Sequence, residues 1–360
     1  MKRLGALAFI LFCISIDSLS APPPFKMVPE IMSTGEDPLS EYQWYLQKAR
    51  VEEAWLVTQG KPQTLVAVVD SGIQYNHPEL NPNLRLKKTE WPFDGNDDDG
   101  NGFVDDAIGW DFVKNSPLPM DGSGHGTFMA SLISSRMGNG IGIRGICPFC
   151  RLLPVRFLDA EGLGDNSDGA RAIRYAAHEG AKVINISTAG EGYDSDWEDA
   201  IAFAGAMDAV VVVSSGNSPQ NLDAEPLYPA NFKFPFLLTV SASTPNDNLM
   251  SGASWGKESV SLLAPGEDIY GIDEDSYGPG SGTSQAAAVV SGVVGLVRSV
   301  NPNLSAKQTV SLIRSTVRKV PGLEKKCQTG GVIDAYRAVK SALSERHLPF
   351  ASSRVAKYQN

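Results

Sequence analysis

The chain has 360 residues, of which 42% are hydrophobic and 20% charged, and its formal net charge is −10 at pH 7. This length is enough for one large domain or two ordinary ones with a sizeable core. The acidic balance argues against a nucleic-acid partner, because phosphate binding needs a basic surface. After the first 20 residues no segment is apolar for long enough to cross a membrane, so we expect no stable membrane association.

The first 20 residues have the layout of a secretory signal peptide. Lys2 and Arg3 precede an apolar stretch from Leu4 to Ile16, and small residues follow it. That stretch is shorter than the roughly 20 residues that span a bilayer. We therefore predict cleavage after Ser20 and a secreted, periplasmic or extracellular location without a transmembrane anchor.

Residues 21–42 are rich in proline and polar residues and lack periodicity, which predicts a flexible leader. We expect the globular part at 43–343 and a poorly ordered tail at 344–360. In the globular part, short β-branched runs such as TLVAVVDSG, KVINISTAG, AVVVVSSGN and PFLLTVSAS alternate with helical patterns such as 168–180. Continuous apolar strands interleaved with helices predict an α/β fold with a mostly parallel central sheet.

Polar residues end three of these runs, at Asp70, Ser187 and Asn217. In parallel α/β sheets, chemistry collects at the carboxyl ends of the strands. A buried carboxylate at such an end needs a partner, because burying an unpaired charge is costly. Asp70 is therefore either a capping carboxylate in a turn or part of a site, and Asn217 on its own is typical of a turn.

The segment 94–106, DGNDDDGNGFVDD, holds six aspartates. One interpretation is a solvated acidic loop. The other is a calcium loop, because the oxygen ligands follow the spacing that calcium prefers and Gly102 permits the sharp turn. Ile108 stands where the last ligand of such a loop belongs, so Asp105 or Asp106 would replace it. The calcium interpretation predicts ligands from Asp97, Asp99, Asn101, the Phe103 carbonyl and Asp106.

Four histidines are the candidates for a general base. His77 lies in a turn, His178 in an amphipathic helix pattern and His347 in the tail, and each position is typical of a structural or solvated side chain. His125 lies between two glycines at a predicted helix start, in DGSGHGTFMASL, where no neighbouring side chain hems in the imidazole. We therefore take His125 as the candidate base.

The pair Cys147 and Cys150 forms a single CxxC, in GICPFCRL. No second CxxC or nearby histidine pair supports a zinc site. The pair is either a local disulfide, which we favour for an exported protein, or two free thiols, and Cys327 is left over.

Ser284 lies in SGTSQAAAVVSG, directly before a run of small apolar residues. Serine is a preferred helix N-cap residue, so one interpretation is a helix start. The other is a nucleophile, which needs a base and a group that orients the base, because a serine hydroxyl is a weak nucleophile at neutral pH.

Three stretches, VAVVDSGIQYNHPEL, SGHGTFMASLI and SGTSQAAAVVSG, resemble in this order the aspartate, histidine and serine motifs of subtilisin-like serine proteases. The resemblance covers about residues 43–343. It implies a three-layer subtilisin-like fold and an endopeptidase that works through an acyl-enzyme. In this mechanism Ser284 is the nucleophile, His125 the base, and Asp70 the residue that orients the imidazole.

The same resemblance implies further site residues. Asn217 and the backbone N–H of Ser284 would bind the oxyanion, with Thr283 as support. A substrate would pair as an extended strand with two edges, made of Gly162, Leu163 and Gly164 and of Ser187, Thr188 and Ala189. A second calcium site would use side chains of Gln43, Glu79 and Asn139, with carbonyls of Met137, Ile141 and Ile143.

The chain departs from the family pattern at several positions. Ala189 replaces a glycine that is common in the substrate strand, which we expect to tighten the first specificity pocket. Gln285 and Ala288 stand where methionine and proline are usual, and Glu79 stands where many members have aspartate. The 22 residues between the predicted signal and Gln43 are fewer than in a folded inhibitory propeptide.

We expect a monomer that acts on protein or peptide substrates, with structural Ca²⁺. Two alternatives remain at this point. One is a catalytically silent protein that binds peptides on the same fold. The other is an esterase or acyltransferase that uses the same three residues.

Overall fold

The computed structural model describes residues 25–27, 35–91 and 93–346. The expected signal peptide and residues 347–360 of the expected tail lie outside them. The helices are α1 (Trp44–Lys48), α2 (Val51–Trp55), α3 (His125–Ser134), α4 (Asn166–His178), α5 (Ser195–Ala206), α6 (Thr283–Val300), α7 (Ala306–Thr316) and α8 (Ala335–Arg346), with short 3₁₀ turns η1 (Ser40–Tyr42), η2 (Asn81–Asn83) and η3 (Lys88–Glu90). The strands are β1 (Leu65–Asp70), β2 (Trp110–Asp111), β3 (Arg151–Arg156), β4 (Val183–Ile186), β5 (Val210–Ser214), β6 (Leu237–Ser243), β7 (Leu262–Pro265), β8 (Ile269–Asp273), β9 (Ser276–Gly280), β10 (Arg318–Lys319) and β11 (Gly331–Val332).

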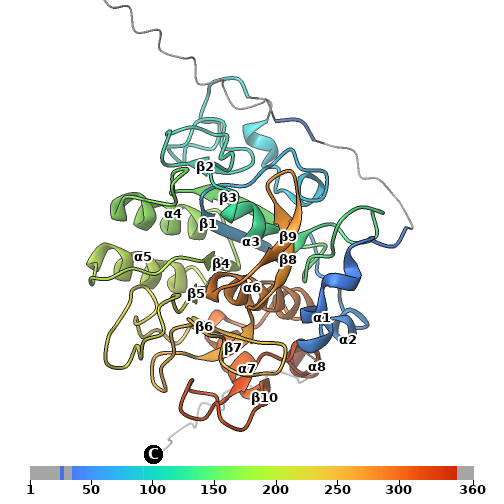
Figure 1. Cartoon of the computed structure of the whole chain (residues 1–360). Helices are drawn as coiled ribbons and strands as arrows, with labels where there is room; N and C mark the ends of the chain where they lie inside the picture. The colour runs from blue at the N-terminus through green and yellow to red at the C-terminus, as the bar shows by residue number, and fades with distance from the viewer. Residues whose placement is uncertain (1–24, 28–34, 92, 347–360) are drawn as a thin grey trace, which may run out of the picture.

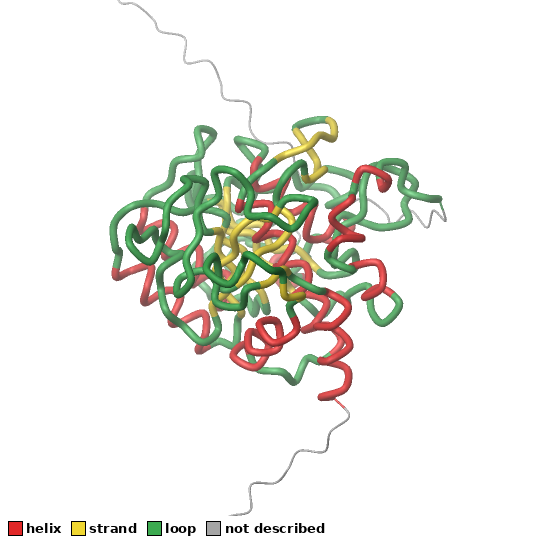
Figure 2. The backbone as a smooth tube through the Cα atoms, turned by 60° about the horizontal axis from the view of Figure 1, so that its bottom comes forward, coloured by secondary structure: helices red, strands yellow, loops and turns green. Residues whose placement is uncertain are grey.

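In the described residues, nine strands form one sheet in the order β10-β11-β7-β6-β5-β4-β1-β3-β2. Neighbouring strands are parallel except for β10 and β11, and β8 and β9 form a separate antiparallel hairpin. Figure 1 shows α4 and α5 on one side of the strands and α3 and α6 on the other, and Figure 2 shows most strands in the middle of the molecule with helices and loops around them. The predicted α/β fold with a mostly parallel sheet flanked by helices is confirmed.

The packing of strand β1 explains why the strand segments of the sequence are unbroken apolar runs. Val66 and Val68 pack into a core with α3 and α6, whereas Ala67 and Val69 pack into a second core with α4 and α5. Successive side chains of a strand point to opposite faces, so a sheet that is covered on both faces has no polar face. The predicted runs coincide with β1, β4, β5 and β6 for this reason.

The expectation of a flexible leader at 21–42 is wrong for the parts that the structure describes. Phe25 is 6% exposed and packs edge-to-face against Tyr75, with ring centroids 6.0 Å apart. Asp37 is 3% exposed, and the Leu39 N–H donates a hydrogen bond to the loop that follows α3. The prediction rested on the average composition of the segment. One buried ring and one buried carboxylate are nevertheless enough to hold a short segment against a domain.

Helix α6 is the one helix of the described residues that is long and apolar enough to span a membrane. All of its residues are buried within the domain, so it is a core helix. Cys147 and Cys150 form the disulfide that the sequence favours, and Cys327 is a buried free thiol. Helix α8 continues to Arg346, past the expected domain end at residue 343.

Candidate active site

Three neighbouring strands and two helices bring the predicted catalytic residues to one edge of the sheet. β1 ends at Asp70, and its neighbour β4 is followed by Ser187. β5, which pairs with β4, is followed by Asn217. Helix α3 begins at His125, and Ser284 lies in the first turn of α6. Residues that are far apart in sequence therefore meet at the carboxyl ends of the strands.

Asp70 and His125 form a pair in which the carboxylate is buried and the imidazole is partly exposed. The His125 Nδ1 lies 2.7 Å from Asp70 Oδ1, which also accepts a hydrogen bond from the Ser71 N–H. Asp70 is fully buried, whereas the side chain of His125 is 36% exposed. The negative charge of Asp70 raises the pKa of the His125 imidazole above its usual value, against the opposing effect of burial.

Close backbone packing sets the position of His125. A Cβ atom on Gly126 would lie 2.1 Å from the Gly72 carbonyl oxygen, so only glycine lets the start of α3 approach the end of β1 this closely. Asp121 holds the same helix start, because its carboxylate accepts a hydrogen bond from the Thr127 N–H. The sequence analysis did not single out Asp121, although its place before a glycine-rich helix start is typical of a capping residue.

Asn217 and Ser284 are held by hydrogen bonds from their surroundings. Asn217 Oδ1 accepts from both the N–H and the hydroxyl of Thr283, at 2.9 and 3.0 Å. Since this fixes the amide through its oxygen, Asn217 Nδ2 remains as a donor. The Ser284 hydroxyl donates to the Ser187 carbonyl oxygen at 3.0 Å, and in the described part of the chain it makes no hydrogen bond with His125.

The two predicted substrate edges line a common cavity. Gly162, Leu163 and Gly164 face Thr188 and Ala189 across a space of about 290 Å³. Trp197, Tyr228 and Pro229 close its far side. The main-chain N–H and carbonyl of Leu163 are both hydrogen-bonded to Asp159, so this residue does not offer its backbone to a peptide in this conformation.

The comparisons with known proteins identify the family of the chain. The model of the subtilase family matches residues 61–333. The chain belongs to the subtilase family. This subtilase is 34% identical over 309 residues to thermitase of Thermoactinomyces vulgaris, in a match that covers 85% of this chain and 99% of thermitase.

Other relatives are longer than this subtilase. It is 32% identical over 336 residues to subtilisin-like protease 1 of Plasmodium berghei, which covers 86% of this chain and 55% of that protein. The chain thus spans about half the length of that relative and of its Plasmodium vivax counterpart. A solved protease structure from Pseudoalteromonas arctica matches the fold with a TM-score of 0.72 and 24% identity, over 86% of this chain and 100% of that one.

The acidic segment of this subtilase forms a cluster that differs from the predicted ligand set. Carboxylate oxygens of Glu90, Asp99 and Asp106 lie within 4.8 Å of one another. Asp97 is not among these three, and its two oxygens accept hydrogen bonds from the Asn101 and Gly102 N–H groups. The sequence analysis missed Glu90, which lies outside the aspartate-rich stretch.

Four carboxylates and two cations meet around this cluster. The Lys87 ammonium pairs with Asp99, with Asp106 at 3.3 Å and with Glu179 at 3.1 Å, and Arg85 pairs with Glu179. One oxygen of the buried Glu90 has no hydrogen-bond partner in the described residues, and burial raises the pKa of Glu90. Two formal negative charges therefore remain, which fits a divalent cation.

The rest of the predicted ligand set belongs to the loop itself. Asn101 Oδ1 accepts from the Phe103 N–H, and Asn101 Nδ2 donates to Asp106 and Glu179. The Phe103 ring packs against Trp110, with centroids 5.0 Å apart. These contacts order the loop around the carboxylate cluster.

The second predicted calcium site has a different member from the one expected. The amide of Gln43 both donates to and accepts from the Arg144 backbone at 2.8 Å. Asp37 of the leader lies there instead and accepts hydrogen bonds from the Gly138 and Asn139 N–H groups. Glu79 accepts from the Ile143 N–H and from the Tyr277 hydroxyl.

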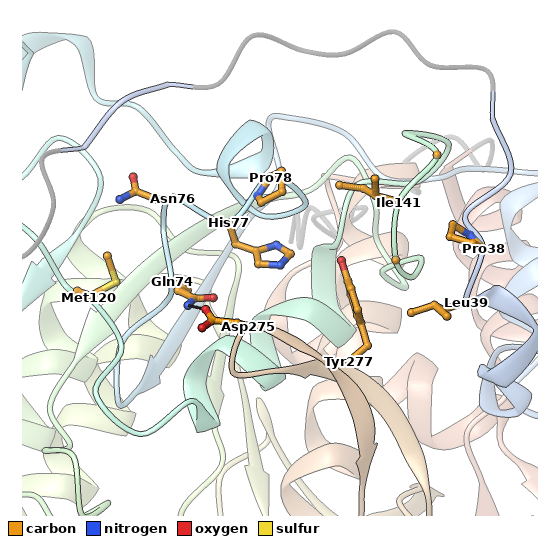
Figure 3. A pocket seen from close by; sticks show the side chains of 12 residues that line it. Pro38, Leu39, Gln74, Asn76, His77, Pro78, Met120, Ile141, Asp275 and Tyr277 are labelled. Carbon is orange, nitrogen blue, oxygen red and sulfur yellow. Dashed lines mark hydrogen bonds between the residues drawn. The ribbon is translucent and has the colours of Figure 1, made fainter.

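The electrostatics of Asp37 and Glu79 suit a cation. Burial raises the pKa of Glu79 to about 7, and the charge of Asp37 adds to the rise. Burial likewise raises the pKa of Asp37. Beside them lies a cavity of about 860 Å³, in which Tyr277 stands between His77 and Leu39 (Figure 3). No member of the Asp70, His125 and Ser284 set lines this cavity, so we place the chemistry at the sheet edge rather than here.

Proposed function

We propose that this subtilase is a secreted serine endopeptidase that cleaves peptide bonds through an acyl-enzyme intermediate. The observation that carries the proposal is the contact of 2.7 Å between Asp70 and His125, at the same sheet edge as Ser284 and Asn217. Family membership and the similarity to thermitase support it.

In the proposed mechanism, Ser284 Oγ attacks the carbonyl carbon of the scissile bond. His125 accepts the serine proton at Nε2 and passes it to the leaving amine, and water then hydrolyses the ester by the same route. Asp70 holds the Nδ1–H of the imidazole and stabilises the imidazolium. Asn217 Nδ2 and the Ser284 N–H donate hydrogen bonds to the oxyanion.

The resting geometry requires one rearrangement. The Ser284 hydroxyl is hydrogen-bonded to Ser187, so it must turn toward His125 before it transfers its proton. Catalytic hydrogen bonds often form only when substrate is bound. A peptide that pairs with the 187–189 edge competes for the same carbonyl oxygen and favours this rotation.

The test compares the wild-type protein with Ser284→Ala. We expect the wild type to cleave a mixed peptide library and to react with a fluorophosphonate probe, and the variant to do neither while it keeps the wild-type circular dichroism spectrum. Labelling without cleavage of peptides, but with cleavage of esters, would favour an esterase. Neither labelling nor cleavage by the folded wild type would favour a silent peptide-binding protein.

We also propose that calcium stabilises the protein at both carboxylate clusters. Glu90, Asp99 and Asp106 would bind it at the acidic segment, and Asp37, Glu79 and Asn139 at the second site. Oxygen donors of this kind are the ligands that Ca²⁺ prefers. Calorimetry of the chelated protein with added CaCl₂ tests binding directly, and an absence of binding heat would overturn this proposal.

Export is part of the same proposal. The signal-like pattern at residues 1–20 and the disulfide between Cys147 and Cys150 support it, because disulfides persist in oxidising compartments. Mass spectrometry of protein recovered from the culture medium of an expression host should give a new N-terminus after Ser20. Retention of the intact chain in the cytosol would contradict export.

A further inference from the structure

The gap between the ends of β4 and β5 receives one particular substrate side chain if the proposed function holds. The scissile carbonyl must lie between Ser284 Oγ and Asn217 Nδ2, while the substrate backbone runs along the 187–189 edge. The residue that supplies this carbonyl then points its side chain between Ala189 and Gly216, which follow β4 and β5. The size of this gap decides which residue can precede the scissile bond.

Leu227 fills the bottom of this gap. A Cβ atom on Gly216 would lie 2.7 Å from Leu227 Cδ1 and 3.6 Å from the Ala189 Cβ. Real Cβ atoms almost never approach another atom as closely as the first of these distances, so even a methyl group on the Gly216 side meets the leucine. Leu227 is 8% exposed, and the atom that lies nearest to Gly216 is the methyl carbon Cδ1 at the end of its side chain.

The backbone around Leu227 holds the side chain in place. Gly190 and Tyr228 exchange two backbone hydrogen bonds, of 2.9 and 2.8 Å, so the residue next to Leu227 is tied to the residue after Ala189. Asn231 also fixes the backbone of Leu227. Its N–H donates to the Leu227 carbonyl oxygen at 2.8 Å, and its side chain accepts a hydrogen bond from the Leu227 N–H. The Cα of Leu227 therefore cannot move away from the gap without breaking contacts to the substrate edge.

We propose that Leu227, together with Ala189, restricts the residue before the scissile bond to glycine, alanine or serine. Ala189 narrows the gap from the β4 side, in line with the expectation from the sequence, and Leu227 limits how deep the gap is. A longer side chain at this position would overlap the leucine, and moving it away from the gap would pull the scissile carbonyl out of line with Ser284. Discrimination of this kind acts on kcat/KM.

The experiment measures kcat/KM for succinyl-Ala-Ala-Pro-X p-nitroanilides in which X is Ala, Leu or Phe. For the wild type we expect the Ala substrate to exceed the Phe substrate by about 10- to 200-fold, the range that a hydrophobic pocket achieves by size. Leu227→Gly should raise kcat/KM for the Phe substrate by a similar factor and leave the Ala substrate nearly unchanged. Ala189→Gly should shift the ratio in the same direction by less.

Three controls keep the inference falsifiable. Titration with diisopropyl fluorophosphate counts the folded active sites of every variant. Leu227→Val and Leu227→Ala should give graded shifts if Leu227→Gly does not fold. Leu222→Ala removes another fully buried leucine from the same connection and should leave the Ala-to-Phe ratio as in the wild type.

The outcomes separate this inference from the proposed function. A wild-type preference for Phe or Leu, or an unchanged ratio in all three Leu227 variants, would overturn the role of Leu227 while peptide cleavage itself stands. A wild type that neither reacts with the titrant nor cleaves any of the three substrates counts against the proposed function instead.

Discussion

Asp70 and Glu79 are two buried carboxylates with the same pattern of contacts and different charged neighbours. Each is fully buried, each accepts two hydrogen bonds at one oxygen, and each has a second oxygen without a hydrogen bond from the described residues. Asp70 faces the imidazole of His125, which gains and loses a proton. Glu79 faces Asp37, a second carboxylate, and burial raises the pKa of Glu79 to about 7, with a smaller further rise from the charge of Asp37.

Since both carboxylates are fully buried, we attribute their different roles to their charged neighbours. A carboxylate beside a titratable base stabilises positive charge that comes and goes, as proton transfer requires. A carboxylate beside another carboxylate must bind a proton or a metal ion. Changes at the first site should therefore alter rate, and changes at the second should alter stability.

Asp70→Asn is the strongest test of the catalytic half of this comparison. Without the negative charge, His125 loses both its orientation and the stabilisation of its protonated form. We expect kcat to fall about 10⁴-fold, as when the orienting carboxylate of a serine protease is replaced by its amide. The melting temperature should change little. A loss of less than tenfold would show that Asp70 is only a structural residue.

Asn217→Leu should have the next largest effect. The lost hydrogen bond forms chiefly in the transition state, so kcat should fall by about 10²- to 10³-fold while KM stays nearly constant, as for the same donor in subtilisin. Steady-state kinetics on one peptide substrate separates the two constants. A change in KM alone would mean that Asn217 helps to bind the ground state.

Glu79→Gln tests the stabilising half of the comparison. A ligand that binds only the folded state adds RT ln(1 + [L]/Kd), about 2.7 kcal/mol at 100 times Kd. We expect calcium to raise the melting temperature of the wild type, Glu79→Gln and Asp37→Asn to lose part of that rise, and kcat to remain near the wild-type value. Gln43→Ala is the matched control and should keep the full calcium response. Equal melting temperatures of the wild type in excess chelator and in millimolar calcium would refute calcium stabilisation.

The pH profile should show the smallest effect. His125 must be neutral to accept a proton, and Asp70 raises its pKa above 6.5, so kcat/KM should rise with pH through a midpoint above 6.5. In Asp70→Asn the raising charge is gone, so the midpoint of the residual activity should move to lower pH. The same midpoint in both proteins would contradict the coupling of Asp70 and His125.

The strands and the catalytic motifs were predictable because their signals are local. Val66 to Val69 form an apolar run that is buried on both faces, and His125 and Ser284 each lie in a short characteristic stretch. Local signals do not predict which strands pair or how close Asp70 lies to His125. Strand pairing joins residues such as Val183 and Val210, and Asp70 lies 55 positions before His125.

Asp37 and Leu227, which the sequence analysis missed, depend on contacts made by irregular segments. Asp37 meets Gly138 across 101 positions, and nothing near Asp37 in the sequence marks it as buried. Gln43 was expected at the calcium site from family resemblance alone, and its amide pairs with Arg144 instead. Leu227 lies in a connection without periodicity, so its place beneath Gly216 emerges only in three dimensions.

The burial of α6 affects which segments of the protein are open to self-digestion. The 18 residues of the helix extend about 27 Å through the core, so we expect their amides beyond the first turn to exchange with solvent only on global unfolding. Residues 160–167 of the substrate edge are exposed throughout and can open locally. Proteolysis follows the segments that open most often. Self-digestion should therefore begin in the substrate edge and spare the helix that carries Ser284.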